Sequence, residues 1–189
     1  QILQLSEESG SKNVSAYNYI SQNCQSAQPL TAITFERFVR NNKIQYAQSD
    51  KSYNEKLIED IIYSHKHGIL DKYLGSTIVE MYMTKNPDEQ SIWSTDQARL
   101  KYVIRQCIGD EMVRWVADSK GVNTAKMLID PLSSKIKKIL NTYNKKYYMP
   151  KDSESYSLSE QKEMMEGHLA IMEICRDIDN KKIHRNLLK

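Results

Sequence analysis

The stretch from Pro87 to Leu140 constrains the fold most, and its densest segment is QSIWSTDQARLKYVIR, residues 90 to 105. Ser94 followed by Gln97 has the spacing of a capping box, in which two side chains satisfy each other's exposed backbone N–H groups at a helix start. An apolar stripe at helical spacing follows, formed by Leu100, Val103, Ile104 and Cys107. The segment therefore predicts a helix that begins near residue 94 and packs this stripe on a core.

A turn signature lies after this helix. The residues from Asp118 to Gly121 separate two apolar runs, and Asp-x-x-Gly is typical of a type I turn closed by a glycine at positive φ. We therefore expect one short β-hairpin at about residues 112–130 in an otherwise mainly α chain. Asp130 and Pro131 then predict the start of another helix, with Asp as the cap and Pro at the first helical position. Helix, hairpin and helix in succession resemble a winged-helix arrangement in the central part, which is a likeness of fold alone.

Length and composition favour a single compact domain. The chain has 189 residues, of which 40% are hydrophobic and 27% are charged, and such a chain is long enough for one sizeable core. We expect an N-terminal arm at residues 1–15 and a helical core with the hairpin at residues 16–151. A linker and C-terminal helices that pack on the core should follow at residues 152–189.

Helical patterns outside the central stretch support this organisation. Two further pairs have the capping-box spacing, Ser52 with Glu55 and Ser157 with Glu160. The last long helix should run from about residue 158 to residue 177. Its expected buried residues are Met164, Met165, Leu169, Met172 and Ile174. Gly75, in the middle of another helical pattern, indicates either close packing against a neighbour or a kink, and both alternatives stay open.

Lysines crowd a span from Pro131 to Lys151 that contains no acidic residue. They are Lys135, Lys137, Lys138, Lys145, Lys146 and Lys151. A solvated helix face explains this pattern. A contact surface for the phosphates of DNA or RNA explains it as well, and Lys120 at the expected hairpin tip would add to that surface. The net charge of +3 permits a nucleic-acid partner without demanding one.

A set of polar and aromatic side chains invites two interpretations. The set is Trp93, Asp96, Arg99, Tyr102, Trp115, Asp118 and Gly121. In a nuclease or transferase, Asp96 and Asp118 would hold a metal ion and Arg99 would bind phosphate. In a buried polar network, Trp93 packs with its indole N–H bonded, and Arg99 pairs with Asp96 and ties the helix to the hairpin. We prefer the network, because nuclease sites need more converging carboxylates than the sequence supplies.

No catalytic or cofactor motif accompanies these residues. The sequence contains no GxxxxGK, HExxH or GxSxG pattern. Cys24, Cys107 and Cys175 are odd in number and far apart, which fits reduced thiols better than disulfides. His65 and His67 could reach one metal ion, but no third ligand lies near them in the sequence. We therefore expect no enzymatic activity, no metal site and no cofactor, and no apolar run has membrane-spanning length.

Five stretches carry a resemblance to a known family. They are ISQNCQSAQPL (20–30), LDKYLGSTIVEMY (70–82), QSIWSTDQARLKYVIR (90–105), WVADSKGVNTAKMLIDPL (115–132) and DIDNKKIHRNLLK (177–189). In this order the chain resembles an uncharacterised protein family that nucleocytoplasmic large DNA viruses such as mimiviruses encode, often in several copies. Members often carry a Cys/His zinc-finger segment ahead of this domain, which implies nucleic-acid binding. This chain has no such Cys/His spacing.

The residues and the resemblance together favour a non-enzymatic module of a large DNA virus. It would associate with nucleic acid or with proteins through its lysine-rich helix. One alternative is a structural or assembly protein whose N-terminal arm and last helix pair with further copies or with other viral proteins. A metal-dependent nuclease is the other alternative. The resemblance implies a location in the host cytoplasm, at the viral factory, or in the virion interior.

Overall fold

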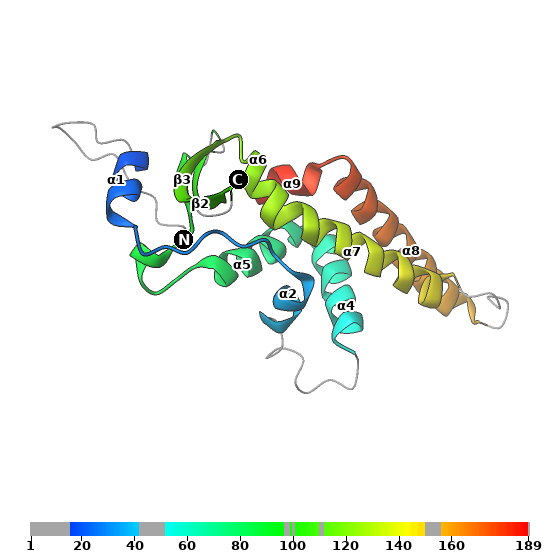
Figure 1. Ribbon diagram of the computed structural model, residues 1–189. Coiled ribbons are helices and arrows are strands. Elements are labelled where there is room, and N and C mark those ends of the chain that lie inside the picture. Colours follow the sequence, from blue (N-terminus) through cyan, green and yellow to red (C-terminus); the bar gives the residue numbers. More distant parts are fainter. Residues whose placement is uncertain are drawn as a thin grey trace.

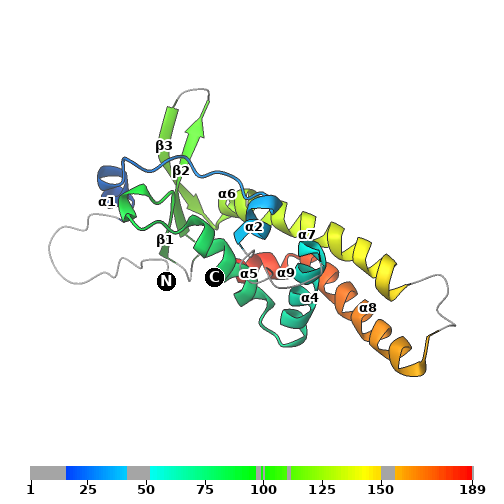
Figure 2. The ribbon, with the colours of Figure 1, turned by 90° about the horizontal axis from the view of Figure 1, so that it is seen from below.

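The computed structural model describes residues 16–41, 52–96, 99, 101–109, 112–149 and 156–188. It is mostly helical with a small antiparallel sheet, which confirms the mainly α class with a small β part (Figure 1). The sheet lies at one end of the molecule. Two long helices, α7 (Asp130–Tyr143) and α8 (Leu158–Asp179), extend side by side towards the other end (Figure 2). The expected N-terminal arm and the linker at 152–155 lie outside the described residues.

The helices build one large apolar cluster, called here the bundle cluster. Besides α7 and α8, its helices are α2 (Phe35–Asn41), α4 (Tyr53–Lys66), α5 (Leu70–Tyr82) and α9 (Lys182–Leu187). Its fully buried members include Phe38, Leu57, Ile61, Leu140, Ile171 and Ile174. Both further capping boxes are confirmed, at Ser52 with Glu55 for α4 and at Ser157 with Glu160 for α8.

The segment predicted as the central helix forms strands instead. The sheet consists of β1 (Ile92–Asp96), β2 (Lys101–Ile108) and β3 (Met112–Ser119), in the order β1-β2-β3 with antiparallel neighbours. Tyr102 in the middle strand lies opposite Ser94 on one side and opposite Asp118 on the other. The prediction of a helix from residue 94 is therefore wrong.

Burial on both faces explains why these strands resemble a helical stripe. One face packs in the α1 cluster, which contains Ile20, Cys24, Ala27, Trp93, Val103 and Trp115, beside α1 (Ala16–Asn23). The other face packs in the junction cluster, which contains Leu30, Tyr102, Ile104, Leu128, Ile129 and Leu188. Consecutive residues of β2 are buried as a result. A short run of consecutive apolar residues does not separate a doubly covered strand from a buried helix.

The turn at Asp118–Gly121 leads into a helix and not into a second strand. Residues 122–129 form α6 (Val122–Thr124) and the π-helical turn η2 (Ala125–Ile129), which continue into α7 and then into a second π turn, η3 (Asn144–Tyr148). The hairpin predicted at 112–130 is therefore misplaced, because β3 pairs with β2 before it. The winged-helix comparison loses its premise, since neither the first helix nor the hairpin stands where it was expected.

Pro131 lies in the first turn of α7, as predicted, but Asp130 does not cap this helix, because helical backbone already runs through η2 before it. Proline has no N–H to offer the carbonyl four residues before it, and its ring crowds that carbonyl. The π turn accommodates this, because the Asp130 N–H donates to the Ala125 carbonyl five residues back. Pro131 has no N–H to donate to the carbonyl of Met127. This carbonyl accepts instead from the Ile33 N–H at 2.9 Å. The proline thus creates an attachment point for the segment that leads into α2.

The structure bears on two expectations about helix faces. At Gly75, α5 is continuous and passes beside α9, where an added Cβ would lie at an ordinary contact distance of 3.5 Å from Leu187 Cδ2. Burial of the α8 residues Met165, Leu169 and Met172 is wrong, because all three are exposed. The core contacts the opposite side of α8, through residues such as Ile171 and Ile174.

We expect Gly121→Ala to lower the free energy of unfolding by about 1–3 kcal/mol. Gly121 has φ 64, and an added Cβ would lie 2.8 Å from Leu188 Cδ2 and 3.1 Å from Tyr102 Cε2. Gly75→Ala is the matched control and should raise the free energy by about 0.5–1 kcal/mol, because Gly75 is helical. Urea unfolding measures both. Equal midpoints for Gly121→Ala and wild type would contradict the requirement for glycine at position 121.

Candidate functional site

The side chain of Asp118 caps the start of a helix. Its side chain is buried, and Oδ1 accepts from the Asn123 N–H at 3.1 Å. Oδ2 accepts from the Thr124 N–H and from the Thr124 hydroxyl, both at 2.8 Å. The carboxylate at the end of β3 therefore caps the helix that starts at Val122, across the two-residue turn. With three donors already bound, Asp118 is poorly suited to be a metal ligand.

Asp96 belongs to a different local arrangement. Its Oδ1 accepts from the Arg99 N–H at 3.1 Å, and its Oδ2 lies 3.6 Å from Arg99 Nη1. The expected pairing of Asp96 with Arg99 is confirmed, but it lies in the connection between β1 and β2 and not on a helix. The expectation that Arg99 ties this segment to Asp118 is wrong. Among the described residues no group of three or more His, Cys, Asp or Glu side chains could hold a metal ion.

The aromatic members of the set are packing residues with bonded polar ends. Trp93 is buried and its indole N–H donates to the Gln90 carbonyl at 3.2 Å, as expected. Trp115 is buried and its indole N–H donates to the Cys24 carbonyl at 3.2 Å. The hydroxyl of Tyr102 donates to the Leu188 carbonyl. Burial, and then the nearby Asp118 carboxylate, raise the pKa of Tyr102 to about 12.

The lysines of the long helix point to several neighbours and do not form a single face. Lys135 places its ammonium 5.4 Å from the centre of the Phe35 ring in α2. Lys146 lies 3.3 Å from Glu55 of α4 and also contacts Tyr147. Lys137 pairs with Asp179 of α8 at 2.6 Å, and this hydrogen bond raises the pKa of Lys137. These three lysines therefore already interact with parts of the same chain.

Three lysines share one open groove along α7. Its lining residues are Ser134, Lys137, Lys138, Asn141, Thr142 and Lys145. Lys138 and Lys145 are exposed, and neither forms an ion pair with a residue in the described ranges. Among the described residues no carboxylate lines the groove, so its polar side chains are ammonium, hydroxyl and amide groups. Such groups bind anions, and phosphate in particular.

Lys120 stands apart from this groove. It is exposed, has φ 70, and lies in the turn between β3 and α6 instead of at a hairpin tip. At a rise of about 1.5 Å per residue, the helix separates it from Lys145 by on the order of 35 Å. The structure therefore groups Lys137, Lys138 and Lys145 and places Lys120, Lys135 and Lys146 elsewhere.

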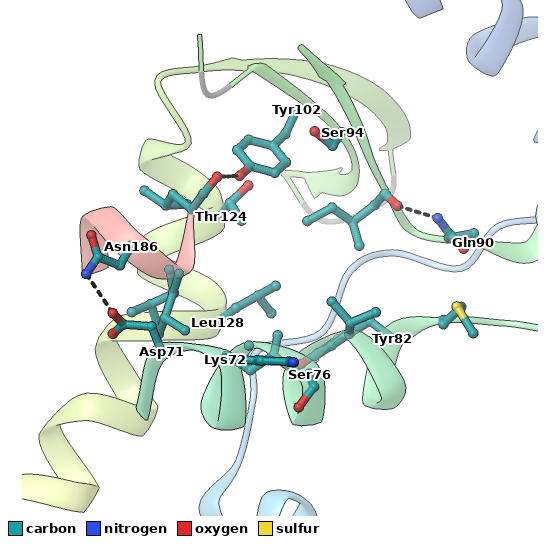
Figure 3. A pocket seen from close by; sticks show the side chains of 18 residues that line it. Asp71, Lys72, Ser76, Tyr82, Gln90, Ser94, Tyr102, Thr124, Leu128 and Asn186 are labelled. Atoms are coloured by element: carbon teal, nitrogen blue, oxygen red, sulfur yellow. Dashed lines mark hydrogen bonds between the residues drawn. The ribbon is translucent and has the colours of Figure 1, made fainter. Parts of the chain in front are cut away.

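A cavity of about 380 Å³ lies between α5, the sheet and α9 (Figure 3). Its walls are mostly apolar and include Ile78, Val79, Ile92, Leu128, Ile129 and Leu187. Several of its polar groups are already bonded, as shown by the Asn186 amide that donates to Asp71 at 2.6 Å and by Tyr102 with Leu188. A cavity of this size and character suits a small apolar molecule. The cavity was not predicted from the sequence, in which Gly75, now in its wall, is the one signal.

The histidines bind to groups of the chain itself. Nε2 of His65 lies 3.1 Å from Glu173 Oε2, and Nδ1 of His67 lies 2.8 Å from the Tyr63 carbonyl. His184 is buried with Nε2 2.8 Å from Asp130 Oδ1. Burial, and then the Lys181 ammonium, lower the pKa of His184 although Asp130 opposes this shift. His65 and His67 therefore bind different partners.

Comparison of the chain with protein-family models, with curated proteins and with solved structures found no match. Within the described ranges, no helix combines the length and the apolar character that crossing a lipid bilayer requires.

If Asp118 caps a helix, its substitution should destabilise the fold without any metal present, whereas a metal ligand would not have this effect. Asp118→Ala should lower the free energy of unfolding by about 2–4 kcal/mol, because it leaves the buried Thr124 N–H and the part-buried Asn123 N–H without their acceptor. Asp96→Ala, which removes an exposed turn contact, should cost less than about 1 kcal/mol. Urea unfolding without added metal measures both. Equal, small effects would contradict the capping role.

The contact of α4 with η3 should make stability depend on pH. Hydrogen bonds from the Tyr147 hydroxyl and then from Ser52 lower the pKa of Glu55 from 4.5 to about 2. A lowered pKa stabilises the fold above the unfolded value, and this stabilisation is lost as the pH falls from 4.5 towards 2. Over this window the melting temperature of wild type should fall more than that of Glu55→Gln. Glu80→Gln, on α5, should follow wild type, and parallel curves for all three proteins would refute the link.

Proposed function

We propose that the chain is a non-enzymatic module that binds the phosphate backbone of DNA or RNA through the groove on α7. The observation that supports the proposal best is the acid-free lining of this groove, where Lys138 and Lys145 are exposed and unpaired among the described residues. Ser134, Asn141 and Thr142 add neutral donors beside them. Hydroxyl, amide and ammonium donors of this kind contact phosphate oxygens, and phosphate contacts carry no sequence information, so the proposed binding is independent of nucleotide sequence.

The strength of this interaction follows from the number of available charges. Lys138 and Lys145 lie seven residues apart, which is about 10 Å along the helix. Lys137 contributes less, because Asp179 already neutralises part of its charge. Two or three phosphates are therefore contacted by one copy of the chain. A contact of this size gives weak, salt-sensitive binding, and the slope of log K against log salt is about −2 to −3.

The viral context belongs to the same proposal. The five sequence stretches that resemble the large-DNA-virus family support an origin in such a virus, and with it a place in the viral factory or the virion interior. A specific observation favours assembly as the second candidate function: exposed apolar residues line the outer side of α8. The last helix, which was expected to pair with other copies, is less suited to this role, because Ile183 and Leu188 are buried within the chain.

The double substitution Lys138→Gln/Lys145→Gln tests the groove. Fluorescence anisotropy with a labelled 20-base-pair duplex and with a labelled single strand of the same length gives the affinity at several salt concentrations. The salt slope should become shallower by about 2, since each lost phosphate contact removes about 1. Lys72→Gln/Lys85→Gln, which removes two exposed lysines elsewhere, should leave the slope unchanged. Binding that ignores salt, or an unchanged slope in the groove variant, would overturn the proposal.

A further inference from the structure

Four large apolar side chains of α8 face away from the core. They are Leu158, Met165, Leu169 and Met172, which are 85%, 58%, 54% and 50% exposed. On the opposite side of the same helix, Gly167, Ile171 and Ile174 are buried. Isolated exposed apolar residues are ordinary, but four in a row on one face of one helix indicate an interaction surface.

The spacing of these residues is that of a coiled-coil seam. Steps of four and three residues connect Leu158, Lys162, Met165, Leu169, Met172 and Arg176. All six are exposed, and they fill the alternating a and d positions of a heptad pattern. The aliphatic stems of Lys162 and Arg176 extend the apolar surface, while their charges reach its rim. The seam runs along most of a helix of 22 residues.

The neighbouring helices contact the flanks of this seam and leave it open. On one flank, α4 reaches α8 through Lys66 with Glu166 at 3.9 Å and through His65 with Glu173 at 3.1 Å. On the other flank, α7 and η3 reach it, for example through Asn144 with His168 at 3.1 Å. Figure 2 shows α8 along an outer edge of the molecule. The seam lies between these flanks on the side turned away from the core.

We infer that this seam is a self-association surface on which α8 of a second copy packs in antiparallel orientation. Charge decides the orientation. In a parallel pair, Lys162 would face Lys162 of the other copy, and Arg176 would face Arg176, in the same seam layers. In an antiparallel pair centred at Gly167, Lys162 lies opposite Met172 and beside Glu173 of the second copy. The antiparallel pair thus replaces two repulsions between like charges with attraction between Lys162 and Glu173.

The same register brings the apolar residues together. Met165 lies opposite Leu169 of the second copy on both sides of the two-fold axis, and Leu158 packs against the stem of Arg176. Each copy presents the same patch, as an interface with two-fold symmetry requires. A standard interface buries about 1,200–2,000 Å², and one helix pair buries less. The dimer is therefore weak, and the dimer fraction depends on the protein concentration. This self-association does not depend on nucleic-acid binding.

Sedimentation velocity over a range of protein concentrations, without nucleic acid, tests the association. Wild type should shift from monomer to dimer as concentration rises. Met165→Glu/Leu169→Glu should remain monomeric with an unchanged helical circular dichroism spectrum, because both residues are exposed. Met83→Glu/Met112→Glu, at exposed sites outside the seam, should dimerise like wild type. A wild-type chain that stays monomeric at every concentration, or a seam variant that dimerises normally, would overturn the inference.

Disulfide cross-linking tests the orientation. In a Cys107→Ser background, which removes the exposed cysteine, Met165→Cys and Leu169→Cys are prepared separately, one with a size tag, and mixed under oxidation. The antiparallel register predicts that the mixed pair cross-links several-fold faster than either variant with itself. Faster cross-linking between identical variants would overturn the antiparallel arrangement. Ser159→Cys, at the flank of the seam, serves as a control for random collisions.

Discussion

The buried carboxylate of Asp118 fixes the relation between the two halves of the molecule. It lies near the end of β3, and it accepts hydrogen bonds from N–H groups in the first turn of the helix that begins at Val122. Tyr102 lies opposite Asp118 in the sheet and bonds to the Leu188 carbonyl at the end of α9. Sheet, long helix and C-terminal helix therefore meet around one acid, whose carboxylate accepts hydrogen bonds from fixed donors. The junction cluster packs around this point.

A second constraint keeps the long helix continuous. Pro131 would normally end a helix, but the π turn before it absorbs the missing hydrogen bond, and Ile33 takes over the carbonyl of Met127. The helix from Val122 to Tyr148 can therefore span from the sheet to the far end of the bundle. Because it contacts α2, α4 and α8 along the way, its lysines are distributed among three neighbours. On the exposed side of α7 and η3, Lys138 and Lys145 remain unpaired among the described residues.

Several short-range features were predicted correctly from the sequence. The capping boxes at Ser52 and Ser157, the mainly α class and the bonded indole of Trp93 all follow from residues close together in the chain. The strands did not follow, because covering both faces of β2 makes its pattern similar to a helical stripe. Asp118–Gly121 was ambiguous for a similar reason: the same turn closes a hairpin or caps a helix, and the following residues decide. Which lysines are paired depends on Asp179 and Glu55, which other helices bring into contact.

The proposed groove on α7 and the proposed seam on α8 belong to one chain, so dimerisation through the seam would affect the affinity of the groove for nucleic acid. In the proposed function, the two lysines of each copy that are unpaired among the described residues contact a phosphate backbone weakly, as their charge implies. A two-fold pair of chains carries two such grooves, and once one groove is bound the second binds in an intramolecular step at high effective concentration. Self-association would then raise the affinity for a long nucleic acid without any new contact, provided that both grooves reach the same strand. A short oligonucleotide that spans only one groove would gain nothing, so the dependence of affinity on oligonucleotide length separates a linked pair of sites from two independent ones.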